Sequence, residues 1–247
     1  MKTKQIEAGD VFTTNEGGSV TVVEYRGWDE VVIKHNDAYG HVVVAQAGSL
    51  RNGRVKNPYH RSVFGVGFVG AGNHLVSVNG KDTPAYKTWS SMIKRCHCPK
   101  YHTKKPTYIG CSVHPDWHNF QNFAEWCERQ YFAECWQLDK DLIVDGNKVY
   151  SADTCTFVPQ QLNTLLNDCG ATRGDLPQGV SRKGKRYKAL LNIDGKQHYL
   201  GAYVTPSEAF EAYKLAKEAN VKRMAEQYRC LIDPRVYDSL MRYEVTK

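Results

Sequence analysis

The last third of the chain carries the pattern that most narrows the possible folds. Three β-strand-like segments follow one another there with hairpin-turn residues between them, including the pair Asp194-Gly195. The segments are 178–182, 186–193 and 196–203. A helix start comes next, because Thr205 can cap a helix, Pro206 suits its first position and Glu208 completes a capping box. We therefore expect a three-stranded antiparallel sheet packed on one helix.

Positive charge is concentrated in the same part of the chain. The net charge is +7, and residues 171–247 hold 15 basic and 9 acidic side chains, whereas residues 1–170 are nearly balanced. Successive side chains of a strand point to opposite faces, so one face of such a sheet packs on the helix and the other faces solvent. A β-ribbon with a solvent-exposed face can enter the DNA major groove. The candidate DNA contacts in this segment are Arg182, Lys183, Lys185, Arg186, Lys188 and Lys196. The alternative is a solvated basic face on an ordinary small α+β domain.

This segment resembles the ethylene-response-factor (APETALA) type of DNA-binding domain over residues 176–225. The matching positions are Gly179-Val180, Arg186-Tyr187-Lys188-Ala189, Gly195-Lys196, Tyr199-Leu200-Gly201-Ala202-Tyr203, Glu208-Ala209 and Ala212-Tyr213. The resemblance implies that the sheet lies in the major groove and that the helix supports it from behind. It also implies that Arg182, Arg186 and Lys188 contact bases or phosphates. The sheet lacks the tryptophans usual in that family, so no base preference is carried over.

The centre of the chain, residues 84–168, is predicted to mix helices and short strands. Helical spacing of Trp89, Met92 and Ile93 predicts the first helix, and a polar loop is expected after it. The predicted helices are 85–95, 119–130 and 160–167, with Pro159 opening the last, and the predicted strands are 108–113, 137–143 and 154–158.

Residues 85–168 are similar to the metal finger of the HNH nucleases, in a phage branch of that superfamily. The similarity rests on Leu138-Asp139-Lys140-Asp141, Gly146-Asn147, the run from Tyr150 to Val158, and a helix carrying Asn163. It implies phosphodiester hydrolysis with Mg²⁺ or Mn²⁺. Asp139 occupies the metal-ligand position, Thr154 falls where many relatives carry an asparagine ligand, and Asn163 is a further site residue. Asp141 is a second candidate metal ligand.

Lys140 stands where that family normally carries its general-base histidine. A lysine accepts a proton only if burial strongly lowers its pKa. Two interpretations therefore stay open: His114 or His118 supplies the base, or the finger is degenerate and the protein binds DNA without cutting it. The plain structural alternative for Asp139, Lys140 and Asp141 is a salt-bridge cluster on an ordinary hairpin.

A third group of residues has metal-binding side chains but no diagnostic spacing. Seven potential zinc ligands lie within 23 residues: Cys96, His97, Cys98, His102, Cys111, His114 and His118. The chain contains no CxxC pair of the kind found in structural zinc sites. The pattern therefore favours thiols without metal, with a structural Zn²⁺ as the weaker alternative.

Residues 1–80 are predicted to be rich in strands and to form a small barrel-like unit. The predicted strands are 20–25, 30–34 and 40–45, and tight turns or a bulged strand are expected over the glycine-rich residues 64–72. The segment 51–61 has four basic residues and no acidic one, so it is either a second DNA contact or a solvated turn. Its candidate DNA contacts are Arg51, Arg54 and Lys56.

These features together predict an α+β protein with three domains: 1–80, 84–168, and 176–247, the last with a C-terminal helical tail. No apolar run is long enough to span a membrane, the N-terminus does not look like a secretory signal, and eight cysteines are too few for a disulfide scaffold. We therefore expect a cytoplasmic protein, in the host-cell cytoplasm if it is phage-encoded.

The predicted function is that of a phage-type HNH homing endonuclease acting, as a monomer, on double-stranded DNA. One alternative keeps DNA binding and drops catalysis, which gives a regulator or a phage factor that acts on host DNA. The other is a zinc-stabilised adaptor that binds protein.

Overall fold

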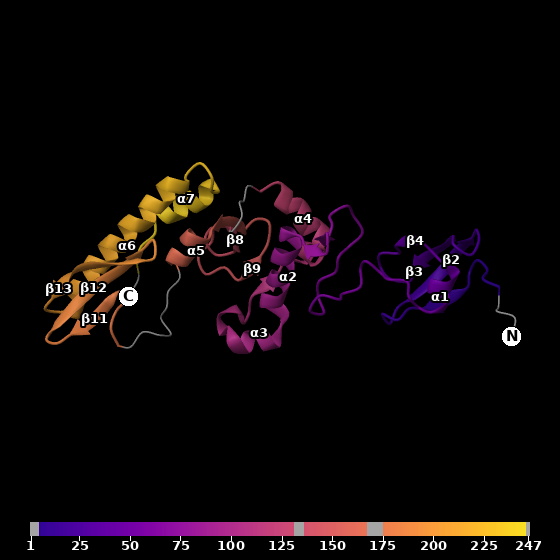
Figure 1. The fold of residues 1–247 in the computed structure, drawn as a ribbon, viewed down its shortest axis with the longest axis horizontal. Helices are drawn as coiled ribbons and strands as arrows, with labels where there is room; N and C mark the ends of the chain where they lie inside the picture. The colour runs from indigo at the N-terminus through magenta and orange to yellow at the C-terminus, as the bar shows by residue number, and fades with distance from the viewer. Residues whose placement is uncertain (1–4, 131–135, 167–174, 246–247) are drawn as a thin grey trace. The chain divides into compact units, whose positions relative to one another are not determined.

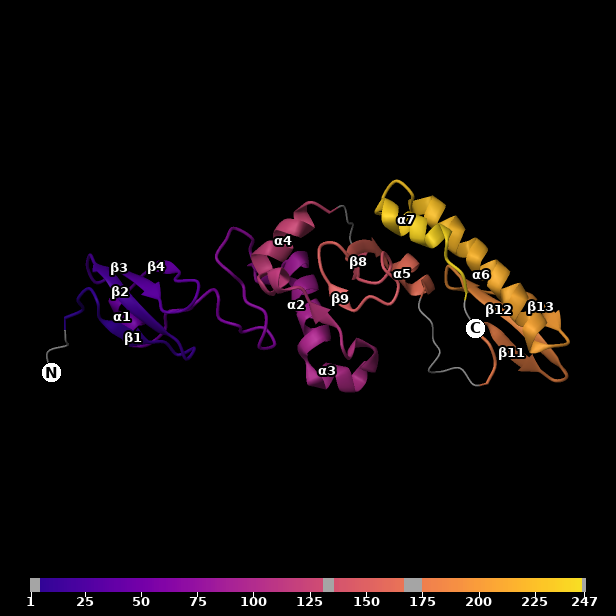
Figure 2. The ribbon, with the colours of Figure 1, turned by 180° about the vertical axis from the view of Figure 1, so that it is seen from behind.

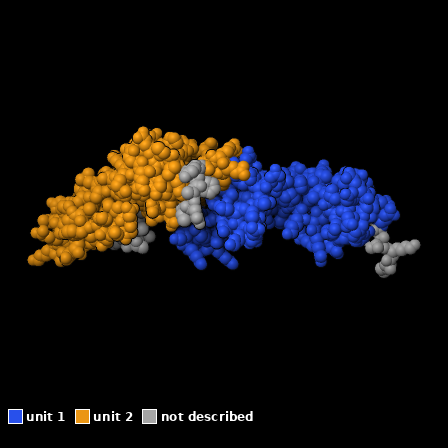
Figure 3. Space-filling model, turned by 45° about the horizontal axis from the view of Figure 1, so that its top comes forward, with its two compact units in different colours: residues 1–109, 113–125 blue, residues 110–112, 126–247 orange. Residues whose placement is uncertain are grey.

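The computed structural model describes residues 5–130, 136–166 and 175–245, and the chain is a mixed α+β protein (Figures 1 and 2). It divides into two units, each described by itself. Unit 1 comprises residues 1–109 and 113–125, and unit 2 comprises 110–112 and 126–247 (Figure 3). Within the described residues, no helix combines the length and apolar character needed to cross a membrane.

Unit 1 begins with a four-stranded antiparallel meander. Its strands, in spatial order, are β1 (Val11–Thr13), β2 (Ser19–Tyr25), β3 (Val31–His35) and β4 (Val42–Ala45). The three predicted strands are confirmed, and β1 is an addition. Alternate residues such as Val20, Val22 and Ile33 are buried against Leu50 of helix α1 (Ala47–Arg51). No pairing of β1 with β4 is found in the described part, so barrel-like closure stays a prediction.

Tight turns occupy the glycine-rich stretch, as predicted. Phe64 and Gly65 adopt positive φ angles of 51° and 74°, and a bridge between Val63 and Gly67 closes the turn. A short hairpin follows, formed by β5 (Ser77–Val78) and β6 (Lys81–Asp82).

The two helices expected in the first half of the centre are confirmed. Helix α2 (Pro84–His97) buries Trp89, Met92 and Ile93, and α4 (Phe120–Glu128) buries Phe120 and Phe123. The indole N–H of Trp89 donates to the Trp117 carbonyl over 2.7 Å.

The prediction of a polar loop after α2 is wrong. Residues there form helix α3 (Pro99–Lys104) and a 3₁₀ turn, η1 (Pro106–Tyr108). Proline opens each of them, a position at which its missing N–H is harmless, and the Tyr101 and Tyr108 rings pack at 5.7 Å. The predicted strand 108–113 is reduced to β7 (Ser112–Val113), and η2 (Pro115–His118) leads into α4.

Unit 2 contains a strand–strand–helix arrangement. Its elements are β8 (Trp136–Asp139), β9 (Val149–Tyr150), β10 (Thr156–Pro159) and α5 (Gln160–Leu166), with β8 and β10 antiparallel. Strand β8 ends at Asp139 and does not reach residue 143, because the Asp139 carboxylate accepts the backbone N–H groups of Asp141 and Leu142 and turns the chain. Pro159 does not open the helix but ends β10, opposite Trp136.

The C-terminal sheet and helix are confirmed. The strands are β11 (Val180–Lys183), β12 (Arg186–Ile193) and β13 (Lys196–Tyr203), followed by α6 (Pro206–Tyr228) and α7 (Pro234–Met241). Asp194 and Gly195 both have positive φ angles, 52° and 77°, as a type I′ hairpin turn requires. The capping box between Thr205 and Glu208 is complete.

A buried cluster joins the strand–strand–helix part of unit 2 to α6 and α7. Leu162 of α5 is 1% exposed and belongs to the same cluster as Val221 of α6 and Val236 and Leu240 of α7. Interiors of this kind pack closely, so the cluster holds α5 and α7 in one arrangement. That arrangement positions the two walls of the candidate site.

Candidate functional site

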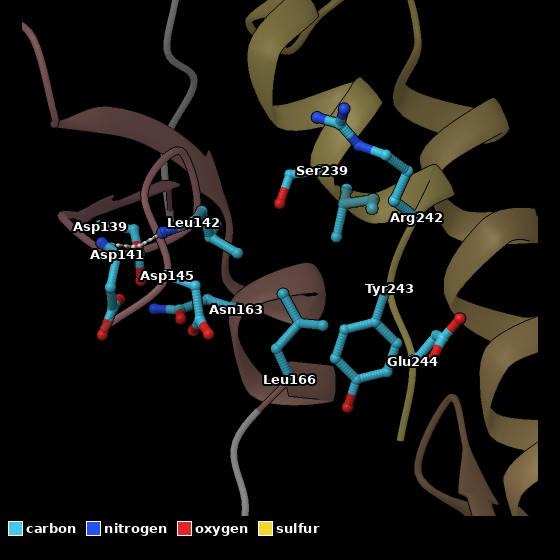
Figure 4. Close-up of a pocket in the computed structure, with 11 residues that line it drawn as sticks. Asp139, Asp141, Leu142, Asp145, Asn163, Leu166, Ser239, Arg242, Tyr243 and Glu244 are labelled. Atoms are coloured by element: carbon cyan, nitrogen blue, oxygen red, sulfur yellow. Dashed lines mark hydrogen bonds between the residues drawn. The ribbon is translucent and has the colours of Figure 1, made fainter. Parts of the chain in front are cut away.

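A polar cavity of about 560 Å³ lies in unit 2, and its walls come from distant parts of the sequence (Figure 4). One side is lined by Asp139, Asp141, Asp145 and Asn163, and the other by Ser239, Arg242, Tyr243 and Glu244. The cavity therefore combines three carboxylates and an amide from the predicted finger with a guanidinium and a fourth carboxylate from residues 239–244, called the tail below.

Asp139 is the most strongly perturbed acid of the cavity. Its Oδ1 atom accepts the N–H groups of Asp141 and Leu142, each over 2.9 Å. Burial, reinforced by the charge and side-chain hydrogen bond of Asp141, raises the pKa of Asp139 to about 6. A buried carboxylate beside a second carboxylate is unfavourable unless a proton or a cation compensates the charge. This electrostatic situation is typical of a cation site.

The oxygen donors of this wall fit a hard divalent cation. Mg²⁺ usually binds through one or two carboxylates, keeps several waters and takes further oxygens from substrate phosphates. Asp139, Asp141 and the amide of Asn163 offer that kind of donor set. Among the residues that the structure describes, no group of three or more His, Cys, Asp or Glu side chains is placed so that it could hold a metal ion.

Lys140 is engaged by its own loop. Its ammonium group donates to Asp141 Oδ2 over 3.0 Å and to the Asn147 carbonyl over 2.8 Å, and the side chain is 12% exposed. Burial lowers the pKa of Lys140, but the hydrogen bond and charge of Asp141 outweigh it and raise that pKa above the usual lysine value. The Asn147 amide donates in turn to the Lys140 carbonyl. Lys140 is therefore charged at neutral pH and holds the loop between β8 and β9.

The remaining predicted finger residues are divided between two places. Asn163 lines the cavity, and its amide N–H donates to Gln137 Oε1 over 2.8 Å. Thr154 is not among the residues that line it, and its hydroxyl donates to the Val149 carbonyl and lies 2.9 Å from the Ser151 hydroxyl. The structure thus brings Asp139, Asp141 and Asn163 together at one cavity and engages Thr154 within its own turn.

The two candidate base histidines belong to unit 1. His114 flanks η2, with its Nδ1 atom 3.5 Å from Asp116 Oδ2. Burial lowers the pKa of His118, and the charges of Arg61 and His114 lower it further, while a hydrogen bond with the Val113 backbone raises it. His118 is therefore neutral at pH 7 and able to accept a proton.

Within the described part of the chain, the predicted zinc ligands include one buried nitrogen without a hydrogen-bond partner, His97 Nε2. Among the described residues, Cys96, Cys98 and Cys111 form no disulfide, and the Nε2 atom of His102 lies 2.7 Å from the Arg95 carbonyl. The His97 and His118 rings approach edge to face at 6.3 Å. The zinc site stays a prediction.

The register of the C-terminal sheet sorts the predicted DNA contacts between its two faces. Lys183 pairs with Arg186, and Lys188 pairs with Ser181 and Ala202. These positions alternate with Ala189 and Leu191, whose side chains are buried with α6, so they face away from the helix. Strands β11 to β13 contain no acidic residue.

Arg182 and Lys196 lie on the opposite face. Arg182 pairs with Tyr187 and Lys196 pairs with Ile193, and both partners pack against the α6 core. Arg182 also places its guanidinium 6.0 Å from the Tyr187 ring centre. The outward face therefore displays Lys183, Arg186 and Lys188, and Lys185 lies in the turn beside them.

The basic residues of unit 1 have different surroundings. Arg51 lies in helix α1, not in a loop, with its guanidinium 5.5 Å from the Trp28 ring centre. Arg54 and Lys56 are exposed on either side of the buried Val55.

The tail side of the cavity was absent from the sequence-based prediction. Arg242 and Glu244 belong to no sequence motif, and Asp145 is not among the residues singled out from the sequence. Leu240 and Leu162 belong to one buried cluster that holds the tail beside the predicted finger, and no local sequence signal reports that packing.

No protein-family model, curated protein or solved structure matches the chain.

Proposed function

We propose that the chain is a metal-dependent DNA endonuclease of the HNH type that holds duplex DNA with the outward face of its C-terminal sheet. One observation carries the proposal: two adjacent carboxylates, Asp139 and Asp141, line a polar cavity, and burial raises the pKa of Asp139. Strongly perturbed acids in a cavity are typical of functional sites. The turn after β8 fixes Asp139 through two backbone hydrogen bonds.

Four residues of the cavity, and Lys140 beside it, have roles in this proposal. Asp139 and Asp141 would hold Mg²⁺ or Mn²⁺, and Asn163 would add an amide oxygen. The bound ion supplies Lewis-acid activation of the phosphate and a more acidic water. Lys140 holds the metal-binding loop, and Arg242 offers positive charge to a phosphate oxygen from the tail side. No histidine is among the described residues that line the cavity, so His114 and His118 of unit 1 stay only the sequence-based candidates for the base.

Cleavage of supercoiled plasmid tests the nuclease directly. We expect nicked or linear product with Mg²⁺ or Mn²⁺ and none with a chelator, using plasmid that carries DNA from the source genome and its relatives. The protein acts as a monomer in this proposal, so product formation should rise linearly with protein concentration. Cleavage that persists without divalent cation would contradict the metal-dependent mechanism.

A second candidate function is DNA binding without catalysis. The charged Lys140 at the family's base position is the observation that favours it. It predicts tight, salt-sensitive binding and no metal-dependent cleavage on any of these plasmids. The zinc-stabilised adaptor instead predicts one tightly held zinc per chain and unfolding on chelation.

The two faces of the C-terminal sheet give a matched test of DNA binding. We expect Arg186→Ala and Lys188→Ala each to weaken duplex binding and to reduce the slope of log affinity against log salt by about 1, because each removes one phosphate contact. Fluorescence anisotropy over a salt series measures both quantities.

Arg182→Ala and Lys196→Ala are the controls, because they remove the same charge from the opposite face. We expect each to keep the wild-type salt slope. Equal losses from both faces would indicate a general electrostatic effect and would refute binding by the outward face.

A further inference from the structure

An exposed pair of stacked aromatic rings stands apart from the site described above. In unit 1, the Tyr39 and Tyr59 rings stack with centres 4.1 Å apart and an angle of 9°. Both also contact the ring of Phe68, which is only 4% exposed, whereas Tyr39 is 54% exposed. The pair is therefore anchored in the protein from below and open to solvent at Tyr39.

Hydrogen bonds hold the two tyrosines in place. The Asp37 carboxylate accepts the N–H groups of Tyr39 and Gly40 over 3.0 and 2.9 Å, and the Asn57 side-chain carbonyl accepts the N–H of Tyr59 over 2.9 Å. The Asn57 amide donates to Asp37 over 2.6 Å and so joins the two loops. The ring platform is thus formed before any ligand arrives, which reduces the entropy lost on binding.

Three basic side chains belong to the strand and the segment that carry this platform. The side chain of Lys34 lies against Gly40, because a Cβ atom there would come within 2.9 Å of its Cε. Lys56 and Arg61 are exposed in the chain segment that carries Tyr59. Two carboxylates in contact with these loops are also charged, Asp37 as described and Glu16, which accepts the Asn57 N–H over 2.9 Å, and each accepts hydrogen bonds from the loops. An exposed ring face with cations beside it suits a base stacked on tyrosine and its phosphates on lysine.

We propose that Tyr39 is a stacking platform for an unpaired base of DNA, with Lys34 and Lys56 at the flanking phosphates. The proposal shares DNA binding with the proposed function but does not depend on cleavage. It gives unit 1 a preference for bubbles, mismatches or single-stranded segments, which the outward face of the C-terminal sheet does not need.

The test uses the full chain in chelator and a duplex that carries one unpaired 2-aminopurine. We expect the wild-type protein to bind this probe more tightly than the paired duplex and to quench its fluorescence. Tyr39→Ala should lose the quenching and at least about fivefold of the affinity for the probe, since that is the lower end for one base–aromatic stack. Tyr39→Phe keeps the ring and should stay within about twofold of wild type.

Tyr25→Ala is the matched control, because Tyr25 is another exposed tyrosine of unit 1, at 40%. It should behave as wild type. Unchanged quenching and affinity in Tyr39→Ala would overturn the inference, and so would equal wild-type affinity for paired and unpaired probes. If the wild type bound both probes equally and still bound the paired duplex tightly, only this inference would fail and the proposed function would stand. If the wild type bound neither probe, the inference and the proposed function would both fail.

Discussion

Replacement of Asp139 by asparagine is expected to reduce the proposed metal-dependent cleavage by at least about 100-fold, because an oxygen ligand with full negative charge would be lost from the proposed cation site. The same substitution is expected to stabilise the cation-free protein at neutral pH. Asparagine keeps the side-chain oxygen that accepts the N–H groups of Asp141 and Leu142, and it removes a charge that burial disfavours. Loss of activity with a gain in stability distinguishes a functional acid from a structural one.

The pH dependence of this gain follows from the direction of the pKa shift. Folding raises the pKa of Asp139 from 3.8 to about 6, so the folded state binds a proton more tightly than the unfolded state. The free energy of unfolding of the wild type therefore falls, relative to Asp139→Asn, as the pH rises through this window. We expect a difference of roughly 3 kcal/mol at pH 7 and almost none near pH 3. Urea denaturation in chelator at both pH values measures it.

Added Mg²⁺ supplies the internal comparison. It should raise the melting temperature of the wild type at pH 7 and leave that of Asp139→Asn unchanged, because only the wild type keeps the ligand. Asp153→Asn, an exposed acid of the same part of unit 2, is the control and should change neither activity nor stability. Wild-type cleavage by Asp139→Asn, or a lower stability in chelator at pH 7, would refute the assignment.

The elements that the sequence predicted well are those with local signals. The turn pair Asp194-Gly195 and the capping box from Thr205 to Glu208 each act within a few residues, so the sheet and helix of the C-terminal part could be placed before the structure was known. The same applies to α2, where Trp89 and Ile93 repeat at helical spacing and are both buried.

The candidate site could be predicted only in part, because its two walls are joined by tertiary packing. Asp139, Asp141 and Asn163 were found through a family resemblance, and the structure places all three at one cavity. Arg242 lines that cavity from the end of α7, which is held in place by a buried cluster that joins Leu240 and Leu162, residues far apart in the sequence.

Arg182 and Arg186 are predicted together as DNA contacts, and that prediction does not separate the two faces of the sheet on which they lie. Lys183 pairs with Arg186 across a two-residue turn, and this register places Arg182 on the other face of the sheet. The turn length and strict alternation would have given that separation from the sequence, whereas the family resemblance alone did not.

Gly179→Ala is expected to give the largest loss of stability among the substitutions considered, about 3 kcal/mol or more. Gly179 has a φ angle of 73°, and a Cβ atom there would lie 1.9 Å from Cδ2 of Tyr213. That ring is 4% exposed in the core between the sheet and α6, so it cannot move aside without opening the core. Gly179 also accepts the N–H of Leu190 over 2.8 Å, which couples the strain to β12. Thermal and urea denaturation measure the effect, and duplex binding should weaken with it.

Gly184→Ala separates backbone strain from steric conflict. Gly184 has a similar φ angle, 59°, but a Cβ atom there would meet nothing within 4 Å. Gly184→Ala should therefore lower the free energy of unfolding by about 1 kcal/mol, which is the cost of a left-handed backbone conformation alone. Because the additional loss at Gly179 is assigned to the Tyr213 ring, Tyr213→Leu should relieve part of it in the double variant. Equal losses at the two glycines, or additive losses in the double variant, would show that the contact between Gly179 and Tyr213 does not limit the packing of this sheet on α6.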